Sequence, residues 1–157
     1  MMGWNFLGKR EGRSVANEAL MCAVLNALAD GRAQPLLDAV HEDVSWTMSV
    51  AQKGFFPFGG TYSGKAGVEQ VLAGLSKRYR FRRFEPQELV SCEEIVWGLF
   101  DVQMEHVEEH QPPPRTFTTE MAIRWRVRDK RILEHHTFVD TLSFFFASNP
   151  AAAMAAS

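Results

Sequence analysis

The sequence predicts an α+β fold, because helical and strand patterns are segregated along the chain. Two helical segments, a strand and a third helix occupy the first half, and four strand-like segments follow one another in the second half. Short connections between the last four strands favour antiparallel neighbours. Segregation of this kind is typical of α+β domains, not of doubly wound sheets.

The three helices are predicted from their ends and from one apolar stripe. The first covers residues 14–30, where Ser14 can accept an orphan backbone N–H and Gly31 follows the last turn. The second is short, over 33–41, with Pro35 in a first turn that needs no N–H there. The third shows the spacing of one helical face, through Val68, Val71, Leu72, Leu75 and Tyr79.

The strands are predicted from alternation between apolar and polar residues. The clearest alternation places six residues on one face: Phe117, Thr119, Met121, Ile123, Trp125 and Val127. The predicted strands cover residues 44–50, 81–91, 95–107, 117–128 and 132–140. Residues 51–64, rich in Gly and Phe, are predicted to form a loop, Pro112–Pro114 to end a hairpin, and Asp129-Lys130 to form a tight turn.

We expect three segments along the chain. Residues 1–13 are predicted to be an irregular arm, residues 14–142 the folded domain, and residues 143–157 a Phe/Ala-rich tail. Three exposed Phe at 144–146 would form an apolar patch, so we expect them to pack, either as a lid on a pocket or at a subunit interface.

The bulk composition excludes several classes of protein. At 157 residues the chain can form one domain without a disulfide or a metal. A formal net charge of −2 favours neither nucleic acid nor an anionic membrane. Cys22 and Cys92 lack metal or redox spacing, so we expect two buried thiols in a reducing compartment. Without a signal-like or membrane-spanning apolar run, we expect a cytoplasmic protein.

Three stretches resemble the SnoaL-like proteins of the nuclear-transport-factor-2-like (NTF2-like) superfamily. They are LLDAVHEDVSW at 36–46, GTYSGKAGV at 60–68 and ILEHHTFVD at 132–140, in an order and spacing similar to that family. The resemblance implies an NTF2-like cone, in which a curved antiparallel sheet wraps on three helices around an apolar pocket. It also implies a homodimer. Fold alone does not imply a reaction.

Two enzymes of this superfamily provide tests of activity. The positions that correspond to the proton-transfer residues of ketosteroid isomerase fall near Met48, Val24 and Ile123, which cannot transfer a proton or donate a hydrogen bond. The resemblance to limonene-epoxide hydrolase is partial. Asp101 and Asp140 stand at matching places, but the arginine of that enzyme's Asp-Arg-Asp set is replaced by Leu99.

The candidate catalytic residues are therefore Asp140, His136 and Asp101. Asp140 shares a strand face with His136, so the two could form an acid–base pair on a pocket wall. A carboxylate at that place can equally cap the strand end. Asp101 lies on a strand whose two faces are both partly apolar, so the sequence leaves open which face meets the pocket.

The candidate ligand-binding residues are apolar and mostly aromatic, and a plain filled core is the alternative for several of them. They are Trp46, Met48, Phe55, Phe58, Met121, Ile123, Trp125 and Phe138. We expect a small apolar molecule in the pocket, possible acid–base catalysis of an isomerase, dehydratase, cyclase or epoxide-hydrolase type, and no cofactor. The alternative is a ligand-binding or dimerisation module without chemistry.

Metal and nucleic-acid sites are not expected. His106 and His110 have helical spacing on a predicted strand and hairpin end, so their side chains need not converge on a metal with Glu105 and Glu109. The basic runs at 78–83 and 124–128 lack a glycine-rich phosphate loop and interleaved exposed aromatics. Such runs are typical of a solvated or salt-bridged face.

Overall fold

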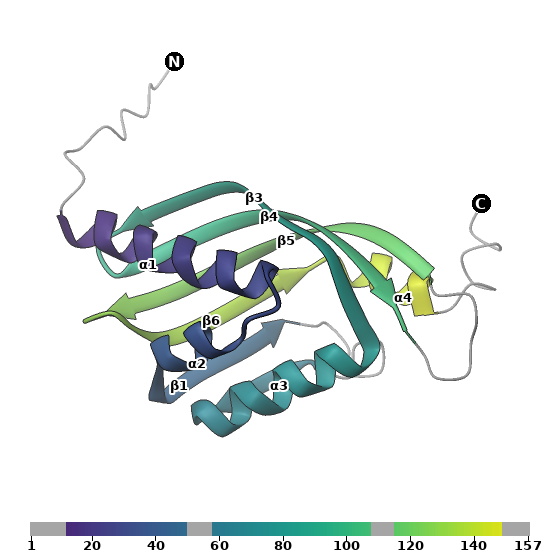
Figure 1. Cartoon of the computed structure of the whole chain (residues 1–157), viewed down its shortest axis with the longest axis horizontal. Coiled ribbons are helices and arrows are strands. Elements are labelled where there is room, and N and C mark those ends of the chain that lie inside the picture. Colours follow the sequence, from purple (N-terminus) through teal and green to yellow (C-terminus); the bar gives the residue numbers. More distant parts are fainter. Residues whose placement is uncertain (1–11, 50–57, 108–114, 149–157) are drawn as a thin grey trace, which may run out of the picture.

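The computed structural model describes residues 12–49, 58–107 and 115–148, and Figure 1 shows the arrangement of the chain. The helices are α1 (Gly12–Ala29), α2 (Gln34–Ala39), α3 (Gly64–Arg78) and α4 (Thr141–Ser148). The strands are β1 (Val40–Ser49), β2 (Gly60–Ser63), β3 (Tyr79–Cys92), β4 (Ile95–His106), β5 (Arg115–Arg128) and β6 (Arg131–Val139). The predictions for residues 1–11, Phe55 and Pro112–Pro114 lie outside the described residues.

The α+β fold is confirmed, and the sheet is mixed, not purely antiparallel. Its strand order is β2-β1-β6-β5-β4-β3. The last four strands, β3 to β6, pair antiparallel as predicted, and β1 pairs antiparallel with β2, but β1 and β6 pair in parallel. These two strands lie far apart in the sequence, so no short turn between them could indicate their relative direction. The sheet is open and strongly curved, with α1, α2 and α3 on one side (Figure 1).

Two elements were not predicted. Strand β2 lies within the predicted loop and pairs with β1, Tyr62 opposite Trp46. With four residues it is too short to show a strand pattern, and it exists because β1 offers it an edge. Helix α4 occupies part of the predicted tail, beginning directly after Asp140. Phe144 on this helix is 1% exposed and packs against Tyr79 and Phe117 of its own chain.

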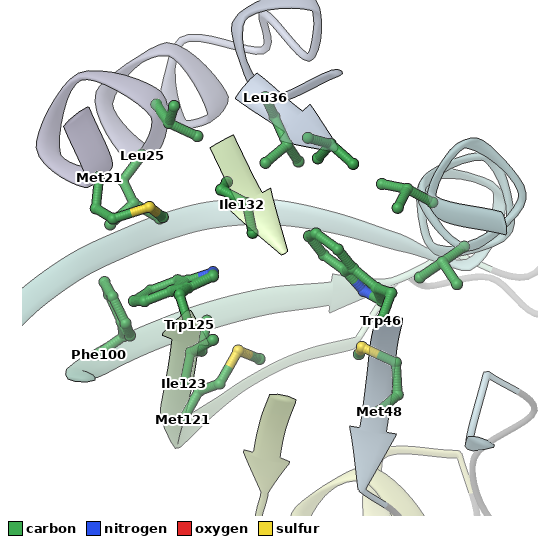
Figure 2. Packing of buried hydrophobic residues seen from close by; sticks show 14 of the residues in the cluster. Met21, Leu25, Leu36, Trp46, Met48, Phe100, Met121, Ile123, Trp125 and Ile132 are labelled. Atoms are coloured by element: carbon green, nitrogen blue, oxygen red, sulfur yellow. The ribbon is translucent and has the colours of Figure 1, made fainter. Parts of the chain in front are cut away.

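The two faces of the sheet differ sharply in burial. We call the face that packs against the helices the inner face and the opposite one the outer face. On β5, the predicted alternation is confirmed from residue 121 onward. Four residues of the predicted face are buried on the inner face: Met121, Ile123, Trp125 and Val127. Figure 2 shows Met21 and Leu25 of α1 and Leu36 of α2 in the same packed layer as the inner-face side chains.

Several local predictions can be compared with the structure. Asp129 and Lys130 have φ of 50° and 59°, as expected for a tight turn between β5 and β6, and Gly31 after α1 has φ of 75°. The predicted cap Ser14 instead lies inside α1, which starts earlier, at Gly12.

Both cysteines are unpaired and exposed, so the prediction of buried thiols was wrong. None of the described helices is long and apolar enough to cross a membrane.

Candidate functional site

The candidate site is a row of aromatic side chains that crosses three strands of the inner face. The parallel pairing of β1 with β6 places Trp46 opposite His135, and the antiparallel pairing of β6 with β5 places His135 opposite Trp125. These three side chains are at most 5% exposed. The histidine is therefore enclosed between two indoles contributed by the neighbouring strands.

The rings in this row contact one another closely. Trp46 and His135 are stacked, with ring centroids 3.5 Å apart and ring planes 5° from parallel. Trp125 meets His135 edge-on, at 5.9 Å and 64°. Trp125 also forms an edge contact with Phe100 of β4, at 6.0 Å and 87°. This packing fixes the position of the imidazole without any charged partner among these contacts.

Burial favours the neutral form of His135. Removal from water lowers the pKa of the imidazole well below its ordinary value, and the neighbouring His136 lowers it further. A neutral imidazole carries one N–H donor and one acceptor nitrogen, and the proton can sit on either nitrogen. His135 can therefore take part in two hydrogen bonds of opposite sense.

Polar atoms without partners mark this part of the inner face. His135 Nε2 forms a hydrogen bond with Oγ1 of Thr137, which is 2% exposed. Among the described residues, no partner exists for the buried His135 Nδ1 or for the buried Trp46 Nε1. An unsatisfied buried polar group costs roughly 1–3 kcal/mol. Two such nitrogens on one stacked pair are the feature that an ordinary filled core would avoid.

A second row of side chains lies next to the aromatic row. It runs through Met48 on β1, Thr137 on β6 and Ile123 on β5 to Gly98 on β4. A Cβ at Gly98 would lie 2.5 Å from the Phe100 ring, so the glycine makes room for that ring. Figure 2 shows Trp46, Met48, Met121, Ile123 and Trp125 projecting from the sheet toward the helices. The surroundings of the two nitrogens are thus largely apolar.

The predicted ligand-binding residues fall into two groups. Trp46, Met48, Met121, Ile123 and Trp125 come together on the inner face. Phe58 is half-buried and packs against that core, with its ring over Gly74 of α3. Phe138 lies on the outer face, 39% exposed, and stacks on Trp97 at 5.9 Å.

Asp140 lies at the start of α4 and is exposed. Its carboxylate accepts hydrogen bonds from the backbone N–H of Leu142 at 3.0 Å and from the Ser143 hydroxyl at 2.6 Å. The Ser143 hydroxyl, followed by backbone N–H groups of Leu142 and Ser143, holds the pKa of Asp140 below its ordinary value. These contacts are those of a helix N-cap, whereas the structural alternative stated from the sequence was a cap of the strand end.

His136 and Asp101 lie on the outer face. His136 stacks on Phe138, with ring centroids 4.2 Å apart. Asp101 forms an ion pair with Arg83 at 2.7 Å, with both side chains partly exposed. The structure therefore does not bring the three predicted catalytic residues together with the aromatic row.

His135 and Thr137 are the functional candidates that sequence reasoning missed. Counted from the buried Ile132, simple alternation would point Glu134, His136 and Phe138 inward. The pairing of β5 with β6 shifts by one residue between Arg126 and Val127, and this irregularity reverses the alternation. His135 and Thr137 consequently face inward. A polar-apolar pattern cannot reveal such a bulge, because both faces of this strand mix residue types.

No group of three or more metal-ligating side chains occurs among the described residues. Glu105 is buried but pairs with Arg82, its Oε2 accepting from Arg82 Nε at 2.6 Å. His106 lies against Tyr79, with ring centroids 5.3 Å apart. Glu109 and His110 are outside the described residues.

This chain resembles known proteins in sequence and in fold. A family model described as a SnoaL-like domain matches residues 22–135. No curated protein matches the sequence. An NTF2-like protein of unknown function from Burkholderia pseudomallei aligns with a TM-score of 0.71 at 20% identity, covering 80% of this chain and 92% of that one.

Two further solved structures bear on the site. A provisionally assigned polyketide cyclase from Xanthomonas campestris pv. campestris aligns with a TM-score of 0.69 at 18% identity, covering 85% of this chain and 97% of that one. TerC, co-crystallized with polyporic acid, aligns with a TM-score of 0.66 at 23% identity, covering 82% of this chain and 94% of that one. At these identities the similarity establishes the NTF2-like fold.

Proposed function

This chain belongs to the SnoaL-like domain family, and from that premise we propose that its inner face binds a small, mostly apolar molecule with one polar group. The supporting observation is the stacked pair of Trp46 and His135, whose Nε1 and Nδ1 atoms are buried without partners among the described residues. The polar group of the ligand would hydrogen-bond to these nitrogens. Its apolar body would contact the neighbouring Met and aromatic side chains.

The energetics favour a ligand that satisfies both nitrogens. Each unsatisfied buried group costs roughly 1–3 kcal/mol, which a bound partner would recover in part. A molecule without a polar group would leave that cost in place. The co-crystallization of TerC with polyporic acid supports the idea that this fold can hold an organic molecule.

Binding is better supported than acid–base catalysis. Among the described residues, Glu105 is the one buried carboxylate, and its partner is Arg82. The aromatic row thus provides polar nitrogens beside His135 but no free carboxylate to act as a base. Catalytic roles for Asp140, His136 and Asp101 stay predictions from the sequence, and none of the three lies in the aromatic row.

The alternative, a dimerisation module, has a separate observation in its favour. On the outer face, Trp97 is 41% exposed and stacks on Phe138, which in turn stacks on His136. Exposed stacked aromatics are typical of protein interfaces. A homodimer formed through this face is compatible with ligand binding on the other one, and Phe138→Asp should weaken it in sedimentation experiments.

The test of ligand binding is native mass spectrometry with extraction of retained small molecules, using matched variants. Trp46→Phe removes the indole nitrogen, His135→Phe removes both imidazole nitrogens, and each variant keeps an aromatic ring. Trp97→Phe and His136→Phe make the same changes on the outer face. We expect the inner-face variants to retain less of the molecule bound by the wild type, and the outer-face variants to retain it fully.

The proposal fails if both inner-face variants retain that molecule at wild-type occupancy. It also fails if the wild type retains nothing and binds no member of a panel of small aromatic carbonyl compounds and alcohols in calorimetric titrations.

A further inference from the structure

The hydrogen bond between Thr137 and His135 bears on which imidazole nitrogen, Nδ1 or Nε2, carries the proton. Both residues lie on the inner face of β6, two positions apart, and both are nearly inaccessible to solvent, at 2% and 5% exposed. His135 Nε2 either donates to Thr137 Oγ1 or accepts from it, depending on the tautomer. The two arrangements leave different atoms unsatisfied.

In the first arrangement, the proton is on Nε2 and donates to the Thr137 oxygen. The Thr137 hydroxyl proton then needs an acceptor of its own, and the described residues provide none besides His135. In the second arrangement, the Thr137 hydroxyl donates to Nε2, and the imidazole proton is on Nδ1. This arrangement gives the hydroxyl proton an acceptor and leaves the imidazole N–H, now on Nδ1, without one among the described residues.

The second arrangement leaves two N–H donors without acceptors, Nδ1 of His135 and Nε1 of Trp46. The indole nitrogen can only donate. Both donors belong to rings that stack 3.5 Å apart. In the first arrangement, the inner face would instead offer the Trp46 Nε1–H donor and the His135 Nδ1 acceptor. The Thr137 hydroxyl proton would then have no acceptor among the described residues. A ligand acceptor oxygen supplies the lone pair that a donor of the second arrangement lacks, whereas a group that only donates hydrogen bonds does not.

We infer that Thr137 is a positioning residue that holds the proton of neutral His135 on Nδ1, so that the inner face selects ligands by an acceptor oxygen such as a carbonyl. The assignment of the tautomer stands on the contact between His135 and Thr137 and on their burial. The ligand preference rests on the proposed function. Together they make the proposed function more specific, because they favour ligands with an acceptor over ligands whose one polar group is a donor.

The tautomer is tested directly by ¹⁵N NMR of the histidine rings near neutral pH, with the His135 signals assigned by their absence in His135→Phe. Two-bond correlations between the ring carbons' protons and the ring nitrogens distinguish a proton on Nδ1 from one on Nε2. We expect the wild type and Thr137→Ser, which keeps the hydroxyl, to show the proton on Nδ1. We expect Thr137→Val, which keeps the shape but removes the hydroxyl, to show the Nε2 form appearing.

A proton on Nε2 in the wild type overturns the inference whatever the protein binds. An unchanged tautomer in Thr137→Val also overturns it, because another group would then set the proton position. Should Thr137→Val fail to fold, the spectra of the wild type and Thr137→Ser still decide the first of these outcomes.

The ligand preference is tested with two probes of similar size, acetophenone, which only accepts hydrogen bonds, and indole, which only donates. We expect the wild type and Thr137→Ser to bind acetophenone about 3- to 10-fold more tightly than indole, the size of one hydrogen bond. The ratio should fall toward one in Thr137→Val. Tighter binding of indole by the wild type overturns the preference. Binding of neither probe overturns the preference together with the proposed function, while the tautomer spectrum still decides the role of Thr137.

Discussion

The buried imidazole of His135 should make the stability of this protein depend on pH in a way that one variant removes. His135 is 5% exposed and enclosed by Trp46 and Trp125, and burial lowers its folded-state pKa well below the ordinary value. In the unfolded chain the same group titrates near 6.5. Below that pH the unfolded state binds a proton that the folded state does not, so acid favours unfolding.

The magnitude follows from linkage. If His135 stays neutral in the folded protein, lowering the pH from about 7.5 to about 5.5 reduces the free energy of unfolding by about 1.4 kcal/mol through this residue alone. The loss begins near the unfolded pKa and continues until the pH reaches the folded pKa. For a urea m-value of roughly 2 kcal/mol per molar, the midpoint shift is about 0.7 M.

The assay is urea unfolding at the two pH values for the wild type, His135→Phe and Trp97→Phe. Each protein is compared with itself, so the cost of the substitution at one pH cancels. We expect His135→Phe to lose about 1.4 kcal/mol less than the wild type on acidification, and Trp97→Phe, an outer-face substitution that removes no titratable group, to behave like the wild type. Equal losses in the wild type and His135→Phe would refute the reasoning, because His135 would then take up its proton as easily in the folded state as in the unfolded one.

Three further outcomes are expected from urea unfolding. Asp140→Ala should lower the free energy of unfolding by about 1 kcal/mol, because it removes the cap of α4. Asp140→Asn should keep most of this stability, and equal losses in the two variants would contradict the capping role. Gly98→Ala should cost about 1–3 kcal/mol, because the new Cβ must displace the Phe100 ring 2.5 Å away; a neutral result would mean that this ring moves freely. Asp101→Asn should cost less than about 1 kcal/mol, because its ion pair with Arg83 is partly exposed, and a loss of several kcal/mol would show a deeper role.

The candidate site could be predicted only in part. Alternation along β5 identified the face of Met121, Ile123 and Trp125 correctly, because every second residue there is apolar and large. Along β6 the same reasoning favoured His136, the neighbour of the residue that faces inward. The cause is the one-residue shift in pairing between β5 and β6, which depends on how two strands meet and leaves no trace in the alternation of either one.

By itself, the sequence determined the α+β class, the order of the main helices and strands, and which residues of β5 would be buried. These properties depend on local periodicity and turn chemistry, which neighbouring residues encode. Only the tertiary structure decided the parallel pairing of β1 with β6, the inward direction of His135 and Thr137, and the capping contacts of Asp140. Each of these depends on residues brought together by the fold of the whole chain, and the stacking of Trp46 on His135 exists because two distant strands become neighbours.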